Sequence, residues 1–373
     1  MLFPLGGPVP ENDIIGRDSF IDTLQMRLAE GHSVMLAGPR RIGKTSLAQE
    51  VLRRLKKQGL YVASVDFFRL SSKRNIAESI INSCLENRTG IRRTLDAVWD
   101  QAKLLAGSAK IAVKMKDLEF NIGLPRKEMD DETLMEYAFS LPELLAEKDK
   151  KRMVVLFDEF QDAGQITGSD IYKKMRSFFQ LQRNVSYLFL GSKEGMMQSL
   201  FGGKKQAFYR FATVLPIPQI RESDWELYIS RKFRGKNIET SSEAVKEIIS
   251  LAGGHPQDTM LICSEAYYTL LEVEETKLSL DIVRIAFDRA MATLMPVFDE
   301  MLDELSKKHL VREVLHRLAI GDIIYKEKNH PYDVKRAIDQ LTLTAVIEKE
   351  GRGKYRFVEP MLKEYIVRNY QDG

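Results

Sequence analysis

Gly38-Pro39-Arg40-Arg41-Ile42-Gly43-Lys44-Thr45 has the glycine, lysine and threonine spacing of a loop that wraps a phosphate chain. Gly38 and Gly43 let the backbone approach the phosphate chain closely, so that N–H groups at the start of a helix can point at the phosphates. Lys44 is expected to reach the β- and γ-phosphates as a compact point charge, and the Thr45 hydroxyl to complete a Mg²⁺ shell. Together with Ser46, these residues form the predicted nucleotide-binding loop.

The residues on either side of this loop supply the structural context that it needs. The apolar run Ser33–Ala37 predicts a buried strand that ends at the loop, and Thr45–Lys57 predicts a helix that begins there. Strand, glycine-rich loop and helix in this order disfavour an ordinary surface turn. Further upstream, residues 20–28 carry helix-spaced apolar side chains, with Asp18 or Ser19 as the expected cap.

A second motif places two acids directly after an apolar strand. Met153–Phe157 predicts the strand, and Asp158 and Glu159 follow it. Asp158 is expected to hold Mg²⁺ through its water shell, and Glu159 to act as the general base on the attacking water. Taken alone, the pair could simply solvate the end of a strand. The phosphate loop upstream favours the catalytic interpretation.

Alternation of strands and helices predicts the fold class of the first part of the chain. Four near-continuous apolar strands separated by helical stretches favour a parallel sheet with helices on both faces, the α/β fold of P-loop NTPases. The predicted strands are Ser33–Ala37, Tyr61–Asp66, Met153–Phe157 and Tyr187–Leu190. Residues 71–151 form an insertion or a long connection, in which residues 110–122 partly alternate and predict a hairpin.

The length of 373 residues suggests two or three domains. We expect an α/β domain over residues 1–220, a small helical domain over 221–300 and a winged helix-turn-helix over 301–373. The helical patterns of the second domain are Asp224–Phe233, Ser242–Ala252, Asp258–Leu271 and Ser279–Leu294. Those of the third are Leu310–Ile320 and Tyr332–Leu341, followed by strands at 345–349 and 355–358 around Gly351-Arg352-Gly353 and a last helix.

Composition places the chain among folded, soluble proteins. Hydrophobic residues make up 44% and charged residues 29%, and a net charge of +3 is too small to indicate a nucleic-acid partner by itself. Cys84 and Cys263 give neither a disulfide framework nor a metal-ligand spacing. The opening Met1–Leu5 is apolar but carries no basic leader, and no run approaches membrane-spanning length. We therefore expect a cytoplasmic protein that does not enter a membrane.

Two further residues are candidates for the hydrolytic site. Ser192 follows the fourth predicted strand and would stand near the γ-phosphate or the attacking water; an ordinary serine between strand and loop is the alternative. Arg210 lies among aromatic residues and is a candidate cation for transition-state charge, with a solvated or stacked arginine as the alternative. Gly253-Gly254-His255-Pro256 marks, by itself, only the end of one helix and the start of the next.

In this order the motifs resemble the archaeal-type STAND ATPases, signal-transduction P-loop ATPases close to the AAA+ origin-recognition (Orc/Cdc6-like) proteins. The resemblance covers the chain from Asn12 to about Leu294, with a winged helix expected after it. The segments that carry it are Ile14–Asp18, Gly38–Thr45, Leu156–Gln161, Phe189–Ser192, Tyr209-Arg210 and Gly253–Pro256. Asp18 departs from the family pattern, which has glutamate after Gly-Arg, and the insertion matches no motif of the family.

The resemblance implies roles for residues that the spacing leaves open. It implies that Gly16, Arg17, His255 and Pro256 help to cradle the adenine and ribose of ATP or ADP. Ser192 would be the sensor at the fourth strand. The resemblance also implies that Arg210 contacts the γ-phosphate, from its own subunit or from a neighbour in an assembly. Adenine rather than guanine is further favoured because the sequence lacks an Asn-Lys-x-Asp segment.

Two functions follow from these expectations. The first is a slow ATP-driven switch, in which γ-phosphate loss changes the angle between the α/β and helical domains. The second is an ATP-regulated DNA-binding protein that uses Lys335, Arg336, Arg352 and Lys354 on the winged helix. Residues 306–373 carry 14 Lys and Arg against 10 Asp and Glu, so a protein partner or self-assembly remains the alternative to duplex DNA. A small-molecule kinase is disfavoured by the helical and winged parts.

Overall fold

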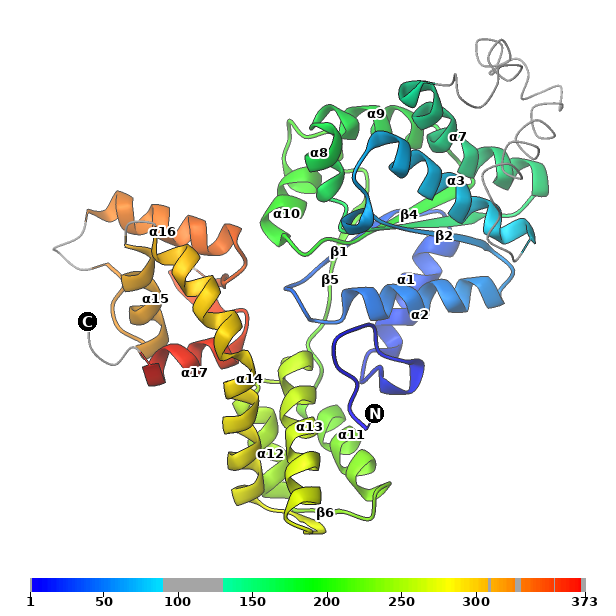
Figure 1. Cartoon of the computed structure of the whole chain (residues 1–373). Helices are drawn as coiled ribbons and strands as arrows, with labels where there is room; N and C mark the ends of the chain where they lie inside the picture. The colour runs from blue at the N-terminus through cyan, green and yellow to red at the C-terminus, as the bar shows by residue number, and fades with distance from the viewer. Residues whose placement is uncertain (1, 90–129, 308–309, 326–329, 352, 370–373) are drawn as a thin grey trace.

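A five-stranded parallel sheet forms the centre of the N-terminal part of the chain (Figure 1). The computed structural model describes residues 2–89, 130–307, 310–325, 330–351 and 353–369. The strand order is β2-β3-β4-β1-β5. The strands are β1 Val34–Ala37, β2 Tyr61–Asp66, β3 Met153–Asp158, β4 Val185–Phe189 and β5 Thr213–Pro216. The predicted α/β fold with a parallel sheet is confirmed.

Both faces of the sheet are buried, which explains why its strands are almost continuously apolar. Val34, Val154 and Leu188 point into one core, and Met35 and Val155 point into the other. The first core includes α1 Asp18–Ala29 and α2 Lys44–Lys57. The second includes α3 Lys73–Thr89, α7 Asp131–Asp149, α9 Asp170–Phe179 and α10 Glu194–Gly202. Short helices η1 Glu11–Asp13, η2 Phe67–Arg69 and α8 Asp162–Thr167 complete this part.

Two local predictions about this part were wrong. The helix expected to be capped by Asp18 or Ser19 begins one residue earlier than either cap allows, with Arg17 at the cap position and no side-chain hydrogen bond there. Strand β5 was missed because it pairs only with β1, is largely exposed and ends at Pro216. Such an edge strand lacks the apolar run that marks the inner strands. The hairpin predicted at residues 110–122 lies outside the described residues.

A helical bundle follows the sheet. It consists of α11 Glu222–Arg234, α12 Ser242–Leu251, α13 Pro256–Glu272 and α14 Leu280–Ser306, with the short strands β6 Glu239–Thr240 and β7 Lys277–Leu278 between them. Helix α14 runs well beyond the predicted end at Leu294 and continues past residue 300, from the bundle to the last helices (Figure 1). The proposed domain division at 300/301 therefore falls within one helix.

The described residues of the C-terminal part form three helices and one antiparallel hairpin. They are α15 Val311–Ile320, α16 Pro331–Leu343, β8 Ile347–Gly351, β9 Lys354–Phe357 and α17 Pro360–Asn369. This is the helix, helix, hairpin and helix order expected from the sequence. Its core is continuous with that of the helical bundle, because Phe298 and Leu302 of α14 belong to the same apolar cluster as Tyr365. No helix in the described ranges is long and apolar enough to cross a membrane.

Candidate nucleotide-binding site

The phosphate loop joins β1 to α2, and its lysine lies inside the loop. Lys44 is 8% exposed, and its Nζ donates to the carbonyl oxygens of Gly38 and Pro39, each at 2.7 Å. Lys44 is the first residue of α2, so the ammonium stands at the positive end of the helix axis. A buried lysine beside a helix N-terminus is a strong anion-binding arrangement.

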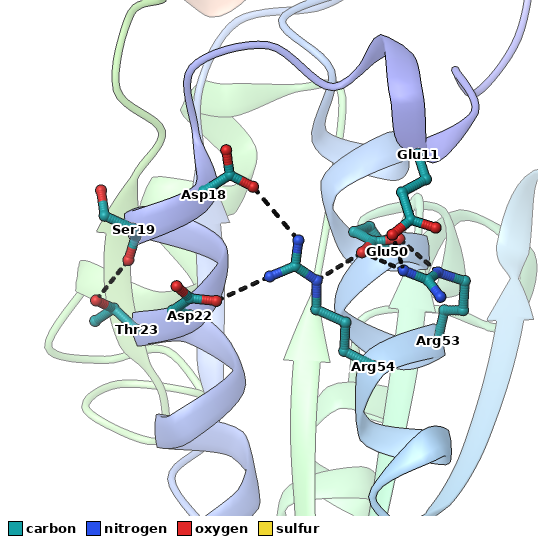
Figure 2. Close-up of polar contacts among 8 residues, drawn as sticks. All are labelled: Glu11, Asp18, Ser19, Asp22, Thr23, Glu50, Arg53 and Arg54. Atoms are coloured by element: carbon teal, nitrogen blue, oxygen red, sulfur yellow. Dashed lines mark hydrogen bonds and ion pairs between the residues drawn. The ribbon is translucent and has the colours of Figure 1, made fainter.

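Helix α2 is tied to the segments before it by a network of charges (Figure 2). Glu50 is nearly buried and accepts hydrogen bonds from Arg53 and Arg54, and the Arg53 hydrogen bond is the main reason that its pKa is lowered. Arg54 also reaches Asp22 at 2.8 Å on α1, and Arg53 reaches Glu11 at 2.6 Å. The network fixes the orientation of the helix that carries the loop.

The two acids after β3 have different surroundings. Asp158 Oδ2 accepts from the Thr45 hydroxyl at 2.9 Å, and Asp158 Oδ1 accepts from the Glu159 backbone N–H at 2.9 Å. Burial raises the pKa of the Asp158 carboxyl above its ordinary value. Thr45 and Asp158 together present hydroxyl and carboxylate oxygens, which is the donor chemistry that Mg²⁺ takes alongside water and substrate phosphates. The described residues thus fit the predicted metal site.

Glu159 is held by donors from the next strand and from the turn that follows it. Its Oε2 accepts from the Ser192 hydroxyl at 2.7 Å, from the Ser192 backbone N–H at 3.1 Å and from Gln161 Nε2 at 2.5 Å. Burial alone would raise the pKa of Glu159, but the hydrogen bonds from Gln161 and Ser192 outweigh it and lower the pKa. The lowered pKa favours the ionised carboxylate, which is the form in which the predicted general base would act.

Arg17 is a buried cation that contacts the phosphate loop. Its Nη1 donates to the Ile42 carbonyl at 2.6 Å and its Nε to the Pro218 carbonyl at 3.1 Å, while the buried Nη2 has no hydrogen-bond partner among the described residues. The side chain is 4% exposed, and burial lowers the pKa of the guanidinium to about 10. A buried donor without a partner, beside a phosphate loop, is placed to bind an anion.

A pocket of about 330 Å³ lies between the phosphate loop, the N-terminal segment and the helical bundle. Its polar wall contains Arg17, the loop from Arg40 to Ser46, Glu159 and Ser192. Its apolar wall is made by residues of three segments that are distant in sequence. These residues are Ile14, Ile15, Ile220, Trp225 and Met260. One side of the pocket therefore suits phosphate and the other suits a planar apolar group.

A family model describing an ATPase domain predominantly from Archaea matches residues 16–262, more than half of the chain. The chain belongs to this ATPase family. No curated protein matches the sequence at a significant level. The matched residues of the ATPase include the phosphate loop, both acids after β3 and most of the apolar wall of the pocket.

Solved structures of similar fold include the following three proteins. The Walker-type ATPase paby2304 of Pyrococcus abyssi has a TM-score of 0.72 at 15% identity, covering 98% of this chain and 100% of that one. The Orc2 protein of Aeropyrum pernix, in ADPNP-ADP complexes, has a TM-score of 0.59 at 16% identity, with 99% and 98% covered. The Cdc6p protein of Pyrobaculum aerophilum has a TM-score of 0.50 at 11% identity, with 100% and 98% covered. At these identities the likeness is one of fold.

Among the residues that the resemblance assigned to adenine and ribose, some line the pocket and others face neighbouring elements. Pro256 lines the pocket, whereas His255 is buried behind the loop with Nε2 at 3.3 Å from the Arg40 carbonyl and Nδ1 at 3.4 Å from Asp258 Oδ1. Burial lowers the pKa of His255, but the hydrogen bond and charge of Asp258, the Arg40 carbonyl and the charge of Glu359 together raise it by more, so the net shift is upward. Gly16 faces α11, since a Cβ there would lie 2.4 Å from Asp224 Oδ2.

Arg210 is the predicted site residue that the structure places elsewhere. It is exposed and lies with Ser33, Val185 and Thr213 in a hollow where β1, β4 and β5 begin. The phosphate loop follows the opposite ends of these parallel strands. Within one chain Arg210 therefore does not meet the pocket, and a role at the γ-phosphate requires a second copy. The order of residues in the sequence could not show at which end of the strands Arg210 lies.

Several pocket residues were missed by the sequence prediction. Pro8 and Val9, from the lead segment, line the pocket, and the Val9 N–H donates to the Ser46 hydroxyl at 3.1 Å. Gln257 and Met260 of α13 also line it. The helical spacing of α13 predicted its existence but could not show which face meets the loop. Gln161 was quoted only as part of a motif, although it directly contacts Glu159, the predicted general base.

Proposed function

We propose that this ATPase is a slow, nucleotide-controlled switch that binds ATP with Mg²⁺ and hydrolyses it to ADP and phosphate. Lys44 and Arg17 bind the phosphates, and the apolar wall of the pocket takes the adenine. Thr45 and Asp158 hold Mg²⁺, which when bound neutralises charge on the phosphates. Glu159 accepts a proton from the attacking water, and Ser192 keeps the carboxylate in place.

The observation that carries the switch is a direct contact between the phosphate loop and the C-terminal part. Arg41, in the loop, donates to both carboxylate oxygens of Glu359 at 3.2 and 3.3 Å, and the two side chains are 29% and 16% exposed. Glu359 directly precedes α17. A change in the loop on loss of the γ-phosphate can therefore be transmitted to the last helices through one ion pair, in which a single nitrogen, Arg41 Nη1, contacts both oxygens of Glu359.

The position of His255 supports this coupling. Its ring lies against the Arg40 carbonyl, one residue before Arg41, and His255 is the cap residue of α13 in the helical bundle. The loop thus touches both the bundle and the segment before α17. Nucleotide-dependent movement of two neighbouring loop residues would be felt by both parts, which is what a two-state switch requires.

Hydrolysis by the wild type and by Lys44→Ala and Glu159→Gln variants tests the proposal, together with a direct nucleotide-binding assay. We expect Lys44→Ala to lose nucleotide affinity, and Glu159→Gln to retain ATP while its kcat falls by about 100-fold or more. We also expect slow wild-type turnover with retained nucleotide. Rapid, unregulated wild-type turnover would contradict the switch, and variants with wild-type binding and turnover would contradict the assigned site.

A DNA-binding function is the second candidate, favoured by exposed basic residues on the C-terminal part. Lys335 and Arg336 are exposed on α16, and Lys354 is exposed at the start of β9; Arg352 lies outside the described residues. The Aeropyrum pernix Orc1 protein, solved in complex with DNA, has a TM-score of 0.50 at 12% identity, covering 98% of this chain and 94% of that one. These observations support duplex DNA as a partner.

The same helix carries features that favour a protein partner or an intramolecular role. Asp339 is exposed on α16 beside the basic residues, and the backbone of Leu343 lies close to Gly195 of α10 in the α/β part. Adding duplex DNA to the hydrolysis assay distinguishes the two. A DNA-dependent change in rate supports the DNA-binding function, and an unchanged rate without binding at low salt removes it.

A further inference from the structure

Gln161 is a buried polar residue for which core packing supplies no reason. Its side chain is 1% exposed at the cap position of α8, just after the two acids of β3. Nε2 donates to Glu159 Oε2 at 2.5 Å and to Asp162 Oδ1 at 3.4 Å. The amide orientation is fixed, because exchanging its oxygen and nitrogen would set an oxygen against two carboxylates. Burying an amide costs free energy unless hydrogen bonds compensate for the lost water, and here those hydrogen bonds go to the two carboxylates.

Within the part of the chain that the structure describes, the hydrogen bonds to the Glu159 side chain all go to one of its two oxygens. Gln161 and Ser192 supply three donors to Oε2 from two different segments, and the structure shows none of them reaching Oε1. The backbone at Glu159 is itself unusual, with φ of 49° in the left-handed region. One carboxylate oxygen is thus anchored, and the other is left to accept a proton. This is the arrangement in which a catalytic base is oriented by a third group.

Gly191 provides the space that this arrangement needs. A Cβ at that position would lie 2.2 Å from Gln161 Oε1, which is closer than side-chain atoms approach one another. Gly191 immediately precedes Ser192, so one short segment after β4 leaves room for the amide and supplies two of the donors. Gln161 Oε1 is itself buried without a hydrogen-bond partner among the described atoms. A buried acceptor without a partner is uncommon in a group with a purely structural role.

We propose that Gln161 is a positioning residue for ATP hydrolysis, which anchors Glu159 Oε2 so that Oε1 faces the attacking water. The inference rests on the proposed hydrolytic function and adds a residue to it. Without the amide, Oε2 loses one of its three donors, so the carboxylate can turn away from the attacking water and hydrolysis slows while ATP still binds.

The test uses Gln161→Met, which keeps the volume but removes the donor, and Gln165→Met on the same helix as the matched control. Gln165 is exposed, and none of the described contacts joins it to the pocket. For Gln161→Met we expect kcat to fall about 10-fold, a part of the factor that a positioned base supplies. ATP affinity should change by no more than about 2-fold, because the phosphate ligands are intact. Gln165→Met should match the wild type.

The comparison of kcat with ATP affinity provides a readout that a merely structural role would not give, because a misplaced base slows hydrolysis without releasing the nucleotide. A wild-type kcat in Gln161→Met overturns the inference. So does a loss of kcat matched by an equal loss of ATP affinity.

Should Gln161→Met unfold at assay temperature, Gln161→Glu keeps the shape and sets a like charge beside Glu159. The donor to Oε2 is then lost and the like charge displaces the carboxylate, so kcat must fall while ATP binding is kept, and a wild-type kcat in Gln161→Glu overturns the inference. A wild type that binds ATP but shows no hydrolysis contradicts the proposed function rather than the position of Gln161. Wild-type hydrolysis with an unaltered Gln161→Met contradicts this inference alone.

Discussion

The pocket at the phosphate loop and the exposed face of α16 both carry cationic side chains, but only the pocket holds them away from water. Lys44 and Arg17 are 8% and 4% exposed and donate to named backbone carbonyls, whereas Lys335 and Arg336 are exposed. A buried charge is costly unless specific groups compensate it, while water compensates an exposed one. The buried cations Lys44 and Arg17 therefore indicate an anionic ligand, whereas the exposed cations Lys335 and Arg336 do not by themselves identify a partner.

Asp158→Asn should give the largest effect, and it tests the contribution of a buried charged group at the pocket. We expect Mg²⁺-dependent kcat to fall by about 100-fold or more, because a charge that holds the metal at the phosphates is lost. The pKa of Asp158 is raised by burial, so its ionised form destabilises the fold above that pKa. Asp158→Asn should therefore melt no lower than the wild type at pH 8.

Hydrolysis assays across a Mg²⁺ titration and thermal unfolding at pH 8 measure the two effects of Asp158→Asn. Asp170→Asn, at an exposed position at the start of α9, is the control and should behave as the wild type. A fall in melting temperature together with unchanged Mg²⁺ dependence would mean that Asp158 is structural.

Arg17→Met tests the other buried cation. The guanidinium donates to the Ile42 carbonyl in the loop and has an unused donor beside the pocket. Losing a hydrogen bond from a charged group should weaken ATP binding by about 10-fold. Isothermal titration with ATP measures the change, and Arg27→Met, on the same helix α1, is the control. Wild-type affinity in Arg17→Met would show that burial of this cation serves the fold and not the nucleotide.

The Arg41–Glu359 pair lies between the two extremes, since both side chains are partly exposed. A double-mutant cycle with Arg41→Gln and Glu359→Gln should give a coupling of about 1 kcal/mol or less in urea unfolding. If the pair transmits nucleotide state, the coupling should differ between ADP-bound and nucleotide-free protein. The charge reversal Arg41→Glu with Glu359→Arg should restore most of this coupling free energy. An equal coupling in both states would contradict the proposed route.

Lys335→Ala and Arg336→Ala should give the smallest effects. If α16 contacts phosphates, each substitution should weaken duplex binding a few-fold and lower the salt slope by about 1. Fluorescence anisotropy over a salt series measures this, and Lys173→Ala on the exposed side of α9 is the control. Should these changes be as large as those at the pocket, the contrast between buried and exposed charge would fail. Unchanged binding would favour a protein partner.

Much of the fold could be predicted because the informative segments are local. The inner strands are apolar on both faces, and the phosphate loop has a fixed spacing, so Gly38–Thr45 and Asp158 were found without any tertiary contact. Strand β5 was not found, since an exposed edge strand with one neighbour lacks that pattern. The length of α14 was underestimated because Pro296 lies inside it, where sequence reasoning ends a helix.

By itself, the sequence determined four of the five strands of the sheet, the phosphate loop and the two acids, because strand periodicity and motif spacing are properties of neighbouring residues. Only the tertiary structure decided which distant residues meet. It brought Arg17 and Glu359 to the loop and Gln161 into contact with Glu159. It also placed Arg210 at the end of the strands opposite to the phosphate loop. The physical reason is that crossover connections set which strand ends meet, and packing, not spacing, sets which helix faces point inward.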